Sequence, residues 1–168
     1  MKTKRPPTSL YSGALISADG VYRYSLTRTF SPLTDPTVCW IMLNPSKADA
    51  HRDDATVRRC IGFSRQAGFG AMMIVNLFAL RSTYPYELTR VEDPVGPEND
   101  FWIRHVSELC NQVICAWGDR GSLLGRDKQV LEALHKLGRY PYCLGKTKSG
   151  NPRHPVRLPY STKLIPLT

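Results

Sequence analysis

The sequence predicts an α/β fold: a three-layer α/β/α sandwich with a central, mostly parallel four-stranded sheet, preceded by an N-terminal β-hairpin. Short apolar runs such as residues 38–43 and 113–117 lack polar alternation, which is typical of strands buried on both faces. Segments with helical spacing separate these runs, and strands that alternate with helices imply right-handed parallel crossovers. The 168 residues fit one ordinary domain, so we expect a single domain over residues 1–168.

The individual elements follow from periodicity and from turn residues. Asp19-Gly20 is a strong turn signal between two strand-like segments, 13–17 and 21–27, and this pattern predicts the hairpin. The tail beyond the last apolar run is rich in Lys, Arg and Pro, and we expect it to end loosely. The remaining strands are expected at 38–43, 71–80, 113–117 and 140–144, and helices after Asp53 or Asp54 and over about 98–110 and 128–137.

Composition restricts the class of protein and its partners. The chain has 23 basic and 14 acidic residues, a net charge of +9 that favours a polyanionic partner such as nucleic acid, although it also fits simple solubility. No apolar run approaches the roughly 20 residues of a membrane helix, and no apolar stretch follows the basic N-terminus as in a signal peptide. Five cysteines without a Cys-x-x-Cys pair predict buried free thiols in a reducing, cytoplasmic setting, with no disulfide and no zinc site.

Polar residues follow each apolar run, at the carboxyl end where parallel sheets bind ligands. Asn44-Pro45-Ser46 follows the first run, Trp117-Gly118-Asp119 follows the third, and Asn76 interrupts the second. A buried amide that lacks a partner costs about 1–3 kcal/mol, so Asn76 either bridges loop backbone or meets a ligand such as the edge of a base. After the fourth run come Lys146, Lys148, Arg153 and His154.

Other motifs point to no cofactor or metal. Gly145-Lys146-Thr147 is similar to the end of a phosphate-binding loop, but Tyr140 stands where that motif requires a glycine. The acidic residues after the first run either cap the following helix or position a water molecule, and with His51 they match no metal-ligand spacing.

Four short motifs, taken in order, resemble the uracil-DNA glycosylase superfamily. They are Ile41-Met42-Leu43-Asn44-Pro45-Ser46, Ile74-Val75-Asn76-Leu77, Cys115-Ala116-Trp117-Gly118 and His154-Pro155. The resemblance covers residues 38 to 155, with Val156 where that superfamily often has Ser. The chain also resembles a family of bacterial and phage proteins.

The resemblance implies an enzyme that hydrolyses the bond between the sugar and a base flipped out of DNA, and the product is an abasic site. Such a reaction would serve DNA repair or attack on foreign DNA. It implies that Asn44 positions the water and His154 assists the departing base, with Asp53 and Asp54 as further catalytic candidates. Ser46 replaces a bulky tyrosine of uracil-specific members, so the expected base is a pyrimidine larger than uracil. Asn76, Ser46 and Phe78 would contact the base. The implied DNA contacts are Pro45, Lys146, Lys148, Arg153, Arg157, Trp117 and Gly118, with Arg58 or Arg59 in addition.

Three other interpretations remain open. A nucleoside or nucleotide hydrolase that acts on a free metabolite would show no salt-dependent affinity for DNA. A non-catalytic nucleic-acid-binding module would bind DNA without forming an abasic product. A small α/β domain of unrelated function fits the same element pattern. The expected partner is DNA, with no membrane contact, no cofactor and no obligate protein partner.

Overall fold

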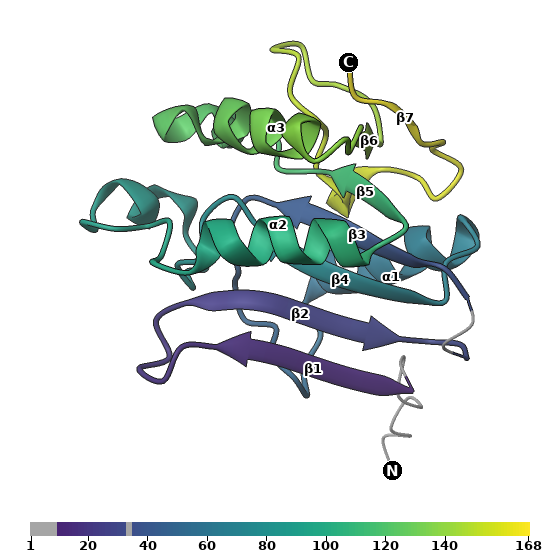
Figure 1. Ribbon diagram of the computed structural model, residues 1–168, viewed down its shortest axis with the longest axis horizontal. Coiled ribbons are helices and arrows are strands. Elements are labelled where there is room, and N and C mark those ends of the chain that lie inside the picture. Colours follow the sequence, from purple (N-terminus) through teal and green to yellow (C-terminus); the bar gives the residue numbers. More distant parts are fainter. Residues whose placement is uncertain (1–9, 33–34) are drawn as a thin grey trace.

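The computed structural model describes residues 10–32 and 35–168, which form one mixed sheet with helices on both faces (Figure 1). The strands of this sheet lie in the order β1-β2-β4-β3-β5-β6-β7. In chain order they are β1 (Tyr11–Ile16), β2 (Arg23–Thr29), β3 (Thr37–Met42), β4 (Ala71–Asn76), β5 (Gln112–Cys115), β6 (Tyr142–Cys143) and β7 (Ile165–Pro166).

The α/β prediction is confirmed, but the sheet has seven strands among the described residues rather than four. The central strands β4, β3, β5 and β6 run parallel, as the alternating pattern predicts. The predicted hairpin, β1 and β2, does not stand apart, because β2 pairs antiparallel with β4 and so extends the sheet. The expectation of a loose tail is wrong, because β7 pairs antiparallel with β6 at the opposite edge.

Helices cover both faces of this sheet. α1 (Ala55–Gln66) packs on one face, whereas α2 (Asn99–Leu109) and α3 (Arg126–Lys136) pack on the other. The described residues also contain three short 3-10 helices: η1 (Pro85–Thr89), η2 (Asp119–Gly125) and η3 (Pro155–Arg157).

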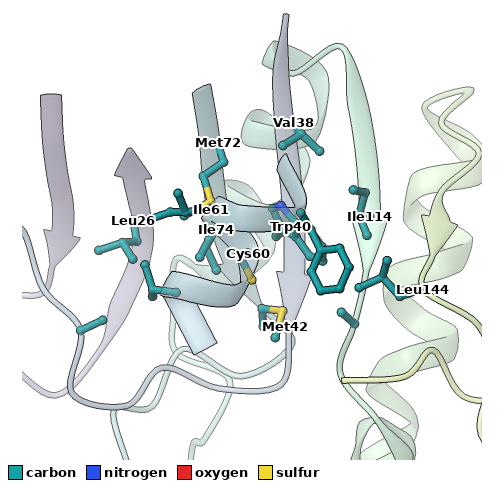
Figure 2. Close-up of a cluster of buried hydrophobic side chains, with 14 of the residues drawn as sticks. Leu26, Val38, Trp40, Met42, Cys60, Ile61, Met72, Ile74, Ile114 and Leu144 are labelled. Atoms are coloured by element: carbon teal, nitrogen blue, oxygen red, sulfur yellow. The ribbon is translucent and has the colours of Figure 1, made fainter. Parts of the chain in front are cut away.

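Each face has its own apolar core. Figure 2 shows the core beneath α1, where Trp40 of β3 lies near Ile114 and Leu144 of the neighbouring strand region. Trp40 is fully buried, and its indole N–H donates to the hydroxyl of Ser64 in α1 at 2.9 Å. The core on the other face includes Ile103 of α2 and is built in the same way. All five cysteines are free and buried. Among residues 10–32 and 35–168, no helix is long and apolar enough to cross a membrane.

One boundary differs from the prediction in a way that matters for the site. The apolar run 71–80 was expected to be one strand, but β4 ends at Asn76. The next residues leave the ladder, and the N–H of Leu77 donates to the carbonyl of Met42 at 2.9 Å. Met42 is also the register partner of Asn76. Asn76 therefore lies at the carboxyl end of its strand, level with the end of β3, and not in the middle of a strand.

Candidate functional site

A cavity of about 380 Å³ opens where the parallel strands β3 and β4 end. Its wall combines the carboxyl ends of these strands, the first turn of α1, the loop before η1 and three residues from elsewhere in the chain. It is lined by Arg23, Met42, Leu43, Asn44, Ser46, Asp54, Ala55, Thr56, Val57, Ile74, Asn76, Ser82, Thr83, Pro85, Trp117 and His154.

Backbone carbonyls fix the orientation of the Asn44 amide. Its Nδ2 donates to the carbonyl oxygens of Ser82 at 2.9 Å and of Pro45 at 3.1 Å. Carbonyl oxygens accept only, so the nitrogen of the amide must face them. The Oδ1 atom of Asn44 has no donor among the described residues and is the atom that this side chain can offer to the cavity.

Asn76 is almost fully buried, and its Oδ1 has no hydrogen-bond partner among the described residues. The position of Asn76 is held from behind by two other side chains. Asn99 donates to the carbonyls of Asn76 and Leu77 at 2.9 and 3.1 Å, and Arg126 donates to the Leu77 carbonyl at 3.1 Å. A rigidly held, unpaired acceptor in a cavity wall fits a ligand that supplies an N–H or O–H group.

His154 reaches the cavity although it stands far from the other site residues in the chain. The N–H of Gly118, three residues beyond the end of β5, donates to the carbonyl of Pro152 at 2.8 Å and holds this loop against the sheet. His154 Nδ1 accepts from the Val156 N–H at 3.4 Å, which places the proton of the neutral ring on Nε2. Burial of the ring lowers the pKa of His154 below its usual value, and the Asp54 carboxylate opposes this shift.

The segment that carries His154 is basic and poor in apolar side chains, and hydrogen bonds hold it in place. The Asp119 carboxylate accepts from the Thr147 hydroxyl at 2.5 Å and from the Asn151 amide at 3.4 Å. The Thr147 N–H also donates to the Asn151 carbonyl at 2.8 Å, closing a tight turn. The segment is therefore a hydrogen-bonded hairpin anchored at the end of β5.

The two aspartates considered as catalytic candidates have different positions. Asp53 forms an ion pair with the buried Arg28 at 2.8 Å and does not line the cavity. Asp54 lines the cavity and also caps α1, because its carboxylate accepts from the Val57 N–H at 2.9 Å. Of this pair, Asp54 alone is placed to act on a ligand.

Two predicted contact residues lie in the interior. Phe78 is fully buried in the core on the α2 side of the sheet and does not line the cavity, because the chain turns away after Asn76. Pro45 is also buried, and its carbonyl accepts from the Ser82 N–H at 2.8 Å, so it presents no surface to a phosphate. Trp117 is 2% exposed and belongs to the cavity wall rather than to the outer surface.

The predicted basic contacts lie outside the cavity. Lys148, Arg153 and Arg157 are exposed, and Arg153 and Arg157 flank His154 in the chain. Lys146 is exposed too, but its ammonium group donates to the Thr168 carbonyl. Arg59, a weaker candidate, is occupied by the carbonyls of Pro155 and Leu158, and Arg58 is exposed beside the start of α1.

Arg23 is the functional candidate that sequence reasoning missed. It is the first residue of β2 and lines the cavity while only 4% exposed. Burial lowers the pKa of its guanidinium to about 10, and the Asp54 carboxylate opposes this shift. A basic residue that begins a strand carries no local signal for such a role, because its position depends on the pairing of the hairpin with β4.

The model of the family described as Protein of unknown function (DUF1643) matches residues 23–156 of the chain. The chain belongs to this family. The match begins at Arg23 and ends two residues after His154, so the DUF1643 segment contains every residue that lines the cavity. No match to a curated protein or to a solved structure reaches significance. Among residues 10–32 and 35–168, no three or more His, Cys, Asp or Glu side chains are grouped so that they could hold a metal ion.

Proposed function

We propose that this protein is a DNA glycosylase that hydrolyses the N-glycosidic bond of a flipped-out, modified pyrimidine base and leaves an abasic site. One observation carries the proposal: Asn44, Asn76 and His154, from three distant parts of the chain, line the same cavity. A volume of about 380 Å³ is sufficient for a substituted base. The positive net charge of +9 and the exposed basic residues beside His154 support a polyanionic substrate.

In this reaction the bond between the sugar C1′ and the base nitrogen breaks, and its electron pair leaves with the base. A water oxygen bonds to the cationic C1′, and the proton that the water loses balances the proton that the base gains. The free Oδ1 of Asn44 would accept a hydrogen bond from this water and hold it in line. An amide is a poor base, so its contribution is orientation and electrostatic stabilisation of the cationic sugar.

His154 would stabilise the negative charge on the departing base. The hydrogen bond to the Val156 N–H leaves Nε2 as the donor of a neutral ring, and the lowered pKa keeps the ring neutral near pH 7. A donor aimed at the position where charge develops lowers the barrier without a change of protonation.

Asn76 would select the base. Its Oδ1 requires a donor, and the ring N–H of a uracil-like base supplies one. Because Asn99 and Arg126 hold the backbone on which Asn76 stands, its side chain would reject a base that offers an acceptor at that point. Ser46 contributes a small side chain to the same wall and leaves room for a substituent.

The test is single-turnover excision from DNA duplexes and single strands that carry a panel of pyrimidines, followed by alkaline cleavage at abasic sites. We expect Asn44→Ala to lower the rate of excision by at least about 100-fold with DNA affinity nearly unchanged, the size of effect seen when one stabilising group is lost. Asn76→Ala should change which base is excised. Gln66→Ala, which also removes an amide side chain at an exposed position outside the cavity, is the matched control.

The outcomes separate the alternatives. DNA binding without an abasic product from any base would identify a non-catalytic module. Hydrolysis of free nucleosides, with no activity on DNA, would identify a metabolite hydrolase. Full activity in Asn44→Ala would remove Asn44 from the mechanism and leave Asp54 as the next candidate.

A further inference from the structure

Arg23 is a buried cation that the proposed chemistry does not use. A guanidinium group has five N–H donors, yet the described residues provide one hydrogen bond, from Nη1 to the Ala48 carbonyl at 2.8 Å. Arg23 takes part in none of the ion pairs of the described residues. Burial of a charge without a paired carboxylate is costly, and proteins tolerate it where a ligand completes the pair.

The charges that neighbour Arg23 are of both signs, and the carboxylates among them form no ion pair with it. Arg28 and Arg81 lie close enough to disfavour the charged form of Arg23, whereas Asp54 and Asp49 favour it. Arg28 is already paired with Asp53, and the Asp54 carboxylate accepts from the N–H of Val57. The first turn of α1, which forms part of the same wall, adds the positive end of a helix dipole.

The position of Arg23 decides which part of a nucleotide it would meet. Arg23 and Asn76 are 4% and 1% exposed, so both belong to the interior end of the cavity. His154, by contrast, keeps solvent contact and marks the rim. A phosphate remains at the rim when a base enters a pocket, and therefore Arg23 faces the base itself.

We propose that Arg23 reads an anionic oxygen group on the base, so that the preferred substrate is a pyrimidine whose substituent ends in a carboxylate. This inference rests on the proposed function for its substrate. A planar guanidinium forms two parallel hydrogen bonds to a carboxylate, and such charge-assisted bonds are roughly twice as strong as neutral ones. The expected preference over the same base without the carboxylate is about 10- to 100-fold.

The experiment compares DNA that carries 5-carboxyuracil, 5-hydroxymethyluracil, thymine or uracil, for the wild type and for Arg23→Met and Arg23→Lys. We expect the wild type to excise 5-carboxyuracil at least 10-fold faster than thymine. Arg23→Met should lower the ratio of the rate on 5-carboxyuracil to the rate on thymine to about one, and Arg23→Lys should retain part of this preference. Arg104→Met, an exposed change on α2, controls for the loss of one positive charge.

A second measurement, of the affinity of free 5-carboxyuracil and of uracil for the same proteins, separates this inference from the proposed function. Tighter binding of 5-carboxyuracil that depends on Arg23, without excision of any base, would support the role of Arg23 and contradict the glycosylase. Excision at equal rates with and without the carboxylate would overturn the role of Arg23 but not the glycosylase function. An equal decrease in the excision rate of Arg23→Met on every base would also overturn the role of Arg23. Equal affinity of the wild type for the two free bases, with no excision, would reject both.

Discussion

The backbone N–H of Gly118 donates a hydrogen bond to the carbonyl of Pro152 at 2.8 Å, and this bond ties the end of β5 to the loop that carries His154. Gly118 has φ +72° and ψ −171°, a conformation that residues with a Cβ rarely adopt. A Cβ at this position would stand 4.0 Å from the Cβ of His154, which is an ordinary contact distance. Glycine is therefore required here by the backbone conformation and not by a lack of space for a side chain.

Gly118→Ala should therefore destabilise the protein by about 1–3 kcal/mol and displace His154 from the cavity. We expect a lower melting temperature and a loss of activity that exceeds the loss of folded protein. Gly138→Ala, after α3, is the control, because Gly138 also has a positive φ, with open space around it and no contact with the cavity. Equal activity per folded molecule in the two variants would show that the Gly118 turn does not position His154.

The adjacent aspartates should separate stability from activity. Asp53→Asn removes the negative charge that pairs with Arg28, which is 1% exposed, and we expect a loss of about 3 kcal/mol in the free energy of unfolding. This is the low end for a broken buried pair, because Arg28 also donates to the carbonyls of Thr27 and Asp49. Excision per folded molecule should stay unchanged. Urea unfolding and single-turnover rates measure the two effects.

Asp54→Asn has the opposite expected result. Asparagine is as good a helix cap as aspartate, so the loss of stability at the cap itself should be less than about 0.5 kcal/mol. The loss of the charge that favours ionised Arg23 adds to it. The carboxylate that faces the cavity is lost, and the rate of excision should fall if its charge stabilises the cationic sugar. A stable Asp54→Asn protein with full activity would leave Asp54 with the capping role alone.

The position of the site could be predicted because it depends on a local rule. Polar residues that follow buried parallel strands meet at one edge of the sheet, and Asn44, Asn76 and Trp117 do so in the structure. The rule does not state how far an apolar run continues as a strand. The resemblance places Phe78 in the base pocket, whereas the hydrogen bond from its N–H to the carbonyl of Leu43 takes the chain out of the ladder, and its side chain lies in the core.

Arg23 and the fixed loop around His154 depend on contacts between segments far apart in sequence, which periodicity does not encode. Arg23 enters the cavity because the hairpin joins the sheet beside β4. The loop is held by Asp119 through Thr147, 28 residues away, a contact that its basic composition does not indicate. Short polar motifs therefore indicated the parallel strand ends well and the antiparallel edge poorly.

Protonation of His154 should destabilise the fold. Because burial depresses its pKa in the folded state, the unfolded chain binds the proton more readily at pH values just below about 6.5. The stability that neutral His154 contributes is present above that pH and is lost as the pH falls toward the depressed folded value. Protonation also converts Nδ1 from the acceptor of the Val156 N–H into a donor.

Urea unfolding at pH 7.5, 6.5 and 5.5 measures this dependence. We expect His154→Gln to show a smaller decrease in stability between pH 6.5 and 5.5 than the wild type, and His135→Gln, at an exposed position in α3, to match the wild type. A pH dependence that is unaltered in His154→Gln would assign the acid sensitivity to other groups.

The exposed basic residues around the His154 loop should determine the salt dependence of DNA binding. Lys148 and Arg153 are both exposed, and neither forms an ion pair within the described residues, so both are available to phosphates. Each phosphate contact contributes about 0.9 to the slope of log affinity against log salt concentration. The double variant Lys148→Ala/Arg153→Ala should therefore lower that slope by about 2 and weaken binding to all sequences alike, because phosphate contacts do not read bases.

Lys136→Ala is the control, since Lys136 lies on α3 and pairs with Glu132 at 2.7 Å. Fluorescence anisotropy at several salt concentrations between 50 and 200 mM gives the slopes directly. Over this range, a protein that makes 6–10 phosphate contacts loses roughly 10³- to 10⁵-fold in affinity. A slope that stays at the wild-type value in the double variant would show that DNA reaches the cavity across another surface, with Arg157 and Arg58 as the next residues to neutralise.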